Sequence, residues 1–299
     1  MEYIFHILSL MCIYAILALS MNFIVGYLGI LNLGFAAFYG IGAYTFAILV
    51  RGIAISGHFI QLSFLASFFT AGIVSAFFGL LLALPTIRLK SHYMAISTLG
   101  FLMIIHGLFI NLPNLTRGAL GIPGIPRPII FGFSFFTLQS FFLLSFIFFL
   151  MVGFILHRIL HSPFGKLIEA IREDETAVKS LGKHTVFYKI QAFIVSSFFA
   201  GIGGALLASL LGYINPWNFN VDELLKTLAM VIVGGMASFW GSIVGAILII
   251  LLPEPLRLLH LPPGIVGPLR YALYGLIIIL FMIFRPNGIL GKRTNIFSK

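Results

Sequence analysis

The sequence is poor in charged residues, and this scarcity excludes a soluble protein. Only 9% of the 299 residues are Asp, Glu, Lys or Arg, whereas soluble domains carry roughly 25%. Apolar residues make up 60% of the chain and 33 of them are phenylalanine, so a surface in water would aggregate. The mean hydropathy of +1.11 therefore indicates a protein whose solvent is lipid.

Residues that carry catalysis, redox chemistry or metal binding are also scarce. The single cysteine, Cys12, lies in an apolar run, cannot form an intrachain disulfide and is expected to be a small buried residue. The eight histidines lack metal-ligand spacing, and neither a GxxxxGK[ST] phosphate loop nor a Ser/His/Asp constellation occurs. The sequence predicts no enzyme, no metal site and no cofactor.

The net charge of +10 does not indicate a nucleic-acid partner. Its cations lie in short segments between apolar runs, without the interleaved aromatics of a nucleic-acid interface. Met1–Ser9 has no basic region, so the first apolar run is expected to span the lipid and not to be a cleaved signal. No polar linker divides the chain, which predicts one domain over residues 1–299.

The apolar runs predict an all-α, polytopic transmembrane bundle with about eight membrane segments. A crossing helix needs about 20 mostly apolar residues. The expected segments are Ile4–Val25, Ile30–Val50, Phe59–Leu84, Tyr93–Leu112, Phe133–His157, Ile190–Gly212, Leu224–Leu252 and Leu269–Phe284.

Lys and Arg residues predict the orientation. The polar loop (residues 158–189) and the tail from Arg285 carry most of the cations, so both are expected in the cytoplasm with the C-terminus. Arg88 and Lys90 place the turn after the third segment on the same side. The side of the N-terminus stays open.

The segment Leu224–Leu252 is interrupted by glycines. Between a cytoplasmic loop and a cytoplasmic tail the number of crossings must be even, so this segment crosses twice or not at all. We expect two half-helices that enter and leave by the outer side, with Gly234 and Gly235 near the midplane; one long helix with glycine packing notches is the alternative. The Gly-rich stretch Gly26–Tyr44 is similar, which favours an inverted repeat around a transport path.

A few polar residues within the segments are candidates for that path. They are Asn32, Thr98 and His106, together with Gly234 and Gly235. Hydrogen bonding between helices is the alternative role of the polar ones. Asp222 and Glu223 are expected to cap the helix that follows them. No ionisable residue falls inside a confident segment, which disfavours an ion-coupled secondary transporter.

The polar loop predicts an amphipathic helix on the cytoplasmic side. Ser162-Pro163 begins it, apolar residues recur at three- and four-residue spacing to Leu181, and Gly182 ends it. The opposite face carries Glu169, Arg172, Glu173, Asp174 and Glu175. A lipid-binding helix would be basic on this face, so the mixed charge favours a protein partner.

The loop resembles the cytoplasmic coupling segment of ABC-importer permeases, whose Glu-Ala-Ala…Gly motif docks on an ATPase subunit. Glu175, Ala177 and Gly182 match this motif, with one extra residue in the spacing and Val178 at the second Ala. Longer strings resemble the branched-chain amino acid permease family, and within it the M-type subunit. These strings are NFIVGYLGILNLGFAAFYGIGAY, LTRGALGIPGIPRP, FGKLIEAIREDETAVKSLG, LLGYINPWNF, MVIVGGMASFWGSIVGA and FRPNGILG.

The resemblance implies a single permease domain of an ABC importer for branched-chain amino acids in a bacterial inner membrane. A second related permease, two ABC ATPase subunits, a periplasmic substrate-binding protein and membrane lipid are the implied partners, with ATP hydrolysis on the ATPases. Urea or short amides are alternative substrates within the same class. The family commonly has Thr-Gly-Gly where this chain has Thr116-Arg117-Gly118, and Arg117 is either a contact for the binding protein or a solvated charge.

Overall fold

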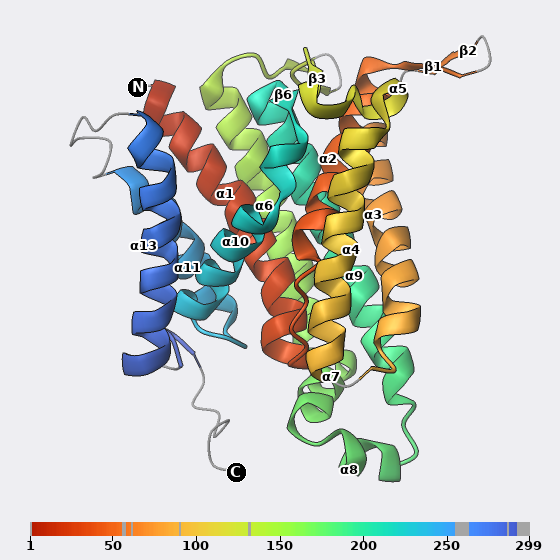
Figure 1. The fold of residues 1–299 in the computed structure, drawn as a ribbon, viewed down its shortest axis with the longest axis vertical. Helices are drawn as coiled ribbons and strands as arrows, with labels where there is room; N and C mark the ends of the chain where they lie inside the picture. The colour runs from red at the N-terminus through yellow and green to blue at the C-terminus, as the bar shows by residue number, and fades with distance from the viewer. Residues whose placement is uncertain are drawn as a thin grey trace.

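The computed structural model describes residues 2–55, 58–60, 62–89, 91–130, 133–254, 263–285 and 287–291. The axes of most long helices are roughly aligned along the bundle, and two short helices, α7 and α8, lie at the end opposite the N-terminus (Figure 1). The helices are α1 (Glu2–Asn22), the π-helical turn η1 (Phe23–Leu28), α2 (Phe35–Arg51), α3 (Phe64–Thr86), α4 (Ser91–Asn111), α5 (Pro113–Thr116), the 3-10 turn η2 (Gly118–Leu120), α6 (Leu138–Leu160), α7 (Pro163–Glu173), α8 (Glu175–Ser180), α9 (Thr185–Leu211), the 3-10 turn η3 (Pro216–Phe219), α10 (Val221–Gly234), α11 (Phe239–Leu251) and α13 (Pro263–Phe284).

Six short strands form three two-stranded antiparallel ladders outside the helical bundle. Their pairs are β1 (Ile53–Ile55) with β2 (His58–Ile60), β3 (Ile122–Pro123) with β6 (Tyr213–Ile214), and β4 (Ile129–Ile130) with β5 (Phe133–Ser134). They connect helices at the N-terminal end of the bundle, so the helical fold class holds.

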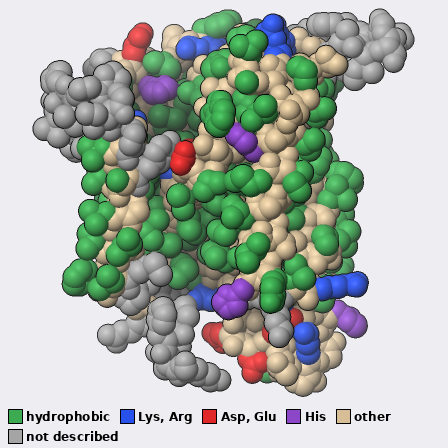
Figure 2. Space-filling model, viewed as in Figure 1, with side chains coloured by type: hydrophobic (Ala, Val, Ile, Leu, Met, Phe, Trp, Pro, Cys, Tyr) green, Lys and Arg blue, Asp and Glu red, His purple; other side chains and the backbone are tan. Residues whose placement is uncertain are grey.

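Helices suited to cross a membrane dominate the chain. Five are long and apolar enough among the described residues: Glu2–Leu28, Phe64–Thr86, His92–Asn111, Leu138–Leu160 and Thr185–Leu211. Shorter apolar helices accompany them over Phe35–Arg51, Phe239–Leu251 and Ala272–Phe281. On the face drawn in Figure 2, hydrophobic side chains cover the middle and charged ones gather mostly near the two ends. The helical membrane bundle is confirmed, while the number of crossings and the inverted repeat stay predictions.

Helix α9 forms the centre of the bundle, where it packs against α2 and α3. A Cβ placed on Gly42 of α2 would lie 2.3 Å from the Cα of Gly201 on α9, so the two backbones touch. Ser75 of α3 donates its hydroxyl to the carbonyl oxygens of Phe38 (2.9 Å) and Ser197 (2.7 Å), which ties the three helices together. Small residues that allow such close approach are a main source of helix association in lipid.

The Gly-interrupted segment is broken, as expected. Helix α10 ends at Gly234, the chain turns through Gly235 (φ 116°), and Ser238 caps α11 by accepting a hydrogen bond from the amide of Gly241 (3.1 Å). The far end of α11 returns toward the N-terminus, where the Tyr3 hydroxyl donates to the Glu254 carboxylate. The prediction of a broken element in place of one long helix is therefore confirmed, while the membrane side by which it enters and leaves stays a prediction.

The expected depth of the glycine pair is wrong. The turn lies at the end of the bundle where α13 finishes, because Ile289 and Leu290 donate their amides to the carbonyls of Val233 and Gly234 (both 3.0 Å). The reason is that α10 begins inside the bundle: Lys226 already lies over the ring of Tyr14, halfway along α1. About two further helical turns then bring α10 to the level of the end of α1.

The expected cap of α10 is also corrected. Asn220, and neither Asp222 nor Glu223, is the N-cap, because its side-chain oxygen accepts hydrogen bonds from the amides of both acids (3.0 and 3.4 Å). Asparagine is a strong N-cap residue. The two acids lie in the first turn, where their negative charge interacts favourably with the helix dipole and stabilises the helix.

Candidate functional site

The polar loop folds into two helices and not the single helix predicted. Ser162 caps α7 by accepting from the amide of Gly165 (3.4 Å), with Pro163 at the first position, as expected. Asp174 then leaves the helical conformation (φ −152°) and accepts from the amides of Thr176 (2.8 Å) and Ala177 (3.0 Å), which starts α8. An Asp side chain that bonds local amides competes with a continuing helix. Gly182 ends the segment with a φ of 76°, as predicted.

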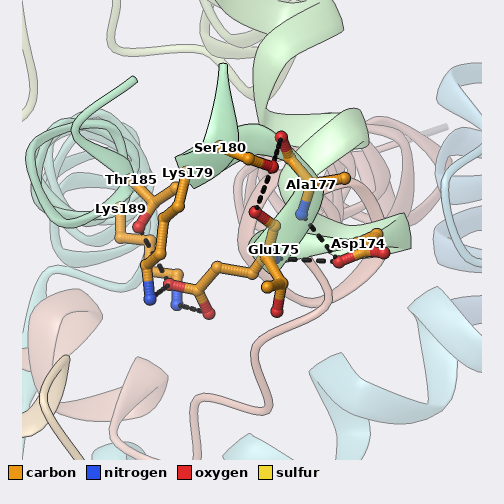
Figure 3. Close-up of polar contacts among 8 residues, drawn as sticks. Asp174, Glu175, Ala177, Lys179, Ser180, Thr185 and Lys189 are labelled. Carbon is orange, nitrogen blue, oxygen red and sulfur yellow. Dashed lines mark hydrogen bonds and ion pairs between the residues drawn. The ribbon is translucent and has the colours of Figure 1, made fainter. Parts of the chain in front are cut away.

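Glu175 holds α8 against the start of α9 (Figure 3). Its carboxylate accepts from Lys189 (2.7 Å) and Thr185 (2.9 Å) of α9 and pairs with Lys179 (3.1 Å). Partial burial opposes ionisation of Glu175, but the hydrogen bonds from Lys189, Lys179 and Thr185 outweigh it and lower its pKa to about 2. The motif glutamate is thus an internal brace of the loop.

The other predicted coupling residues divide between a buried and an exposed side. Glu169 and Arg172 are half-buried, whereas Glu173, Asp174, Ala177 and Gly182 are exposed. The apolar face of the loop packs through Ile168, Ile171 and Val178. Leu181, which the spacing placed on that same face, is 79% exposed at the tip of the loop. Sequence reasoning missed this exposed apolar residue because α8 ends before it.

Arg172 connects the polar loop to the end of α1. Its guanidinium Nη1 donates to the carbonyl oxygen of Gly26 in η1 at 2.6 Å, and its side chain fills the space where Gly29 lacks a Cβ. The rings of Phe164 in α7 and Phe23 in η1 stack at 6.4 Å. Hydrogen bonds that involve a charged group contribute about 1.5–3 kcal/mol, so α7 and η1 are expected to move together.

Asn22 continues this connection to the broken helix. It donates from Nδ2 to the carbonyl of Ser238 (3.0 Å), and its Oδ1 accepts from the amide of Ala237 (3.0 Å). Both partners belong to the turn that follows Gly234 and Gly235. The polar loop, the end of α1 and the turn between α10 and α11 thus form one continuous set of contacts.

The remaining path candidates do not form a single site. Asn32 and Thr98 lie together: Asn32 Oδ1 accepts from the amide of Gly34 (3.0 Å), and Thr98 Oγ1 accepts from the amide of Leu33 (3.0 Å). His106 lies about two helical turns further along α4, with its ring 5.3 Å from that of Trp217. Within the described part of the chain, Asn32 Nδ2 and His106 Nδ1 are buried without a hydrogen-bond partner.

The expectation of no ionisable residue inside the segments is wrong. Glu223 and Lys226 of α10 have side chains only 16% and 17% exposed, and Lys226 contacts Tyr14 at mid-height of α1. The reason is again that α10 starts inside the bundle, so its first turns are buried. Buried ionisable residues are therefore present in the bundle, and their expected absence no longer weighs against a secondary transporter.

The connection around Arg117 borders a pocket at the N-terminal end of the bundle. Arg117 is exposed and has a left-handed backbone (φ 61°), a conformation that favours glycine. A cavity of about 440 Å³ lies between Arg117, Arg51 and Asn114. In the described ranges, no group of three or more His, Cys, Asp or Glu side chains is placed to bind a metal ion.

The apolar helices, the broken pair α10–α11 and the polar end loop define a multi-pass integral membrane protein of the transport class. The family model of the branched-chain amino acid transport system permease component matches residues 3–282, and the chain belongs to this family. No solved structure matches the chain significantly.

Curated relatives agree with this assignment. The chain is 36% identical to the high-affinity branched-chain amino acid transport system permease protein LivM of Salmonella typhimurium and 37% identical to LivM of Escherichia coli, in each case over 95% of this chain and 69% of the relative. It is also 24% identical to the permease protein LivH of Salmonella typhimurium, over 98% of this chain and 96% of the relative.

Proposed function

We propose that this chain is the permease subunit of an ABC importer that moves branched-chain amino acids across a bacterial inner membrane. Its family and its similarity to LivM support the substrate class. ATP hydrolysis belongs to partner subunits, and the chain converts their movement into opening and closing of a path.

The observation that carries this proposal is the contact set from the polar loop to the broken helix. Arg172 bonds to Gly26, and Asn22, at the end of the same helix, bonds to the turn at Ala237 and Ser238. A push on α7 therefore has a direct route to α10 and α11. A packed element with two arrangements is the physical means by which such a movement reaches a distant site.

The charges favour an orientation with the polar loop in the cytoplasm. The C-terminal ends of α3 and α13 lie at the same end of the bundle as α7 and α8 (Figure 1). Arg88 and Arg285 follow these two helices within two residues, so they join the cations of the loop at this end. By the positive-inside rule this end faces the cytoplasm, which places the N-terminus and the Arg117 pocket outside.

The same orientation assigns the partners to surfaces. The exposed tip at Ala177, Leu181 and Gly182 is the proposed dock for an ATPase, because it carries residues that resemble the Glu-Ala-Ala…Gly docking motif and because Leu181 is accessible there. The pocket end faces the periplasmic binding protein. Similarity to both LivM and LivH fits pairing with a second, related permease.

The test is reconstitution of the chain with these partners in proteoliposomes. We expect uptake of labelled leucine that requires ATP and the binding protein, and no competition by urea or acetamide. Leu181→Asp should abolish co-purification of the ATPase, whereas Lys166→Asp, also exposed in the loop, should not. ATP-independent leucine uptake by the chain alone would refute the importer in favour of a secondary carrier, and competition by urea would redirect the substrate assignment.

A further inference from the structure

A group of charged and phenolic side chains is buried where α10 meets α1. Glu223 and Lys226 face each other with 3.8 Å between Oε1 and Nζ, and Lys226 Nζ lies 3.7 Å from the centre of the Tyr14 ring. Arg270 of α13 and Tyr39 of α2 lie on helices that pack against α10, and their charge interactions reach Lys226 and Glu223, respectively. We call these five residues the mid-bundle cluster.

The polar atoms of the mid-bundle cluster are incompletely paired. Among the residues that the structure describes, Tyr39 Oη and Arg270 Nε are buried without a hydrogen-bond partner, and buried Glu223 Oε1 has only the 3.8 Å ion pair with Lys226. The Lys226–Glu223 separation is too long for a hydrogen bond. Unsatisfied buried groups cost free energy and are rare in native proteins, so three in one place point to a ligand that completes them.

The chemistry of the cluster matches a zwitterion. The two cations, Lys226 and Arg270, outnumber the one carboxylate, Glu223, which leaves a net positive charge that can bind the carboxylate of a ligand. Glu223 and the Tyr39 hydroxyl can accept hydrogen bonds from an ammonium group. The wall beside them is apolar: Phe219 packs edge-on against Tyr39 at 5.1 Å and also contacts Tyr44 at 5.9 Å. An α-amino acid with a branched apolar side chain presents these three kinds of group.

The position of the cluster suits a site that opens and closes. The residues of the cluster come from four helices, and Glu223 and Lys226 both lie on α10. The C-terminal end of α10 leads into the turn that is hydrogen-bonded to Asn22. Movement of that turn would change the distance between α10 and the middle of α1, where Tyr14 lies. A ligand site between them would therefore respond to the polar loop.

We propose that Glu223, Lys226 and Arg270, with Tyr14 and Tyr39, bind the zwitterionic head of the amino acid midway along its path. Lys226 and Arg270 hold the carboxylate, and Glu223 with Tyr39 holds the ammonium group. This inference rests on the proposed function, and it adds a substrate-binding site within the membrane part of the protein.

The test uses the purified permease–ATPase assembly without the binding protein, so that only sites in the assembly itself report. Thermal stability is titrated with leucine, with 4-methylpentanoate, which lacks the ammonium group, and with 3-methylbutylamine, which lacks the carboxylate. The variants are Glu223→Gln, Lys226→Met and the double variant, with Asp222→Asn as the matched control on the same turn of α10.

We expect Glu223→Gln to weaken leucine and the amine about tenfold or more while leaving the carboxylate probe unchanged. Lys226→Met should do the reverse, weakening leucine and the carboxylate probe. A purely structural ion pair would lower stability without changing this selectivity. If either single variant fails to assemble, we expect the charge-balanced double variant to assemble, because no unpaired charge is left buried, and to bind no leucine.

Two results would overturn the site: no leucine-dependent stabilisation of the unaltered assembly, or leucine binding by Glu223→Gln equal to that of Asp222→Asn. The proposed function fails by a different result, the absence of ATP-dependent leucine uptake by the unaltered assembly in proteoliposomes.

Discussion

At position 117 the chain carries an arginine in a backbone conformation that favours glycine. A left-handed φ costs an L-residue about 1–2 kcal/mol, and Arg117 adopts a φ of 61°. We expect Arg117→Gly to recover part of this cost and to raise the melting temperature by about 1–3 °C, since glycine also loses more entropy on folding. Thermal unfolding in detergent measures it.

Arg117→Ala is the matched control, because it removes the guanidinium and keeps the strained Cβ. Backbone strain predicts stabilisation by glycine alone, and equal melting temperatures for both variants would contradict it. If the guanidinium contacts the binding protein, both variants should also weaken uptake at low concentrations of that protein; unchanged uptake would make Arg117 a solvated charge.

Glu175 makes the polar loop sensitive to acid. Its pKa of about 2 lies below the value of about 4.3 for a free glutamate, so the ionised form stabilises the folded loop. This contribution is fully present above about pH 4.3 and is lost as the pH falls toward 2. We expect pepsin to cleave between α8 and α9 increasingly over this window, and Glu175→Gln to be cleaved already at pH 5.

Glu173→Gln is the control for Glu175, because Glu173 is exposed in the same loop. It should follow the unaltered protein. Identical pH profiles for Glu175→Gln and Glu173→Gln would refute the bracing role of Glu175.

Among the helices, the contact between α2 and α9 tolerates no added atoms. Since a Cβ on Gly42 would lie 2.3 Å from backbone atoms of Gly201, Gly42→Ala must push the helices apart. We expect a loss of folded protein in detergent, measured by size exclusion and thermal unfolding. Gly107→Ala on α4 is the control: nothing lies within 4 Å of its Cβ, so it should be neutral or stabilising by up to about 1 kcal/mol. Equal behaviour of the two variants would contradict the close contact.

The helices themselves were predictable from sequence, and their interruptions only in part. Glycine content and an even number of crossings predicted the break between α10 and α11. The depth of that break was not predictable, because it depends on η3 and α10 starting inside the bundle. The burial of Lys226 was not predictable for the same reason, because this residue lies near the N-terminal end of its apolar run. The break at Asp174 was missed because helical spacing alone does not show which Asp captures two amides.

The candidate site shows the same limit. Sequence resemblance placed Glu175, Ala177 and Gly182 in the loop motif, and local rules predicted the caps at Ser162 and Gly182. The bond from Arg172 to Gly26 joins residues 146 positions apart, and no local pattern predicts it. Asn22 likewise reads as one polar residue in an apolar run until the turn of the broken helix lies beside it.

At the scale of the whole molecule, the proposed function makes these contacts one route of transmission from the cytoplasmic surface to the membrane path. In this proposal the polar loop receives the movement, η1 and Asn22 pass it on, and α10 carries both the turn and the mid-bundle cluster. We therefore expect the coupling of ATP hydrolysis to transport to depend on Arg172, which takes no part in docking.

The most direct test of this claim is the number of leucine molecules imported per ATP hydrolysed in proteoliposomes that contain Arg172→Ala. Lys166→Ala, exposed on the same helix α7, is the matched control. For Arg172→Ala we predict normal assembly and normal ATP hydrolysis, with a ratio of leucine to ATP lowered about tenfold or more because a hydrogen bond from a charged donor is lost. An unchanged ratio in Arg172→Ala would contradict it.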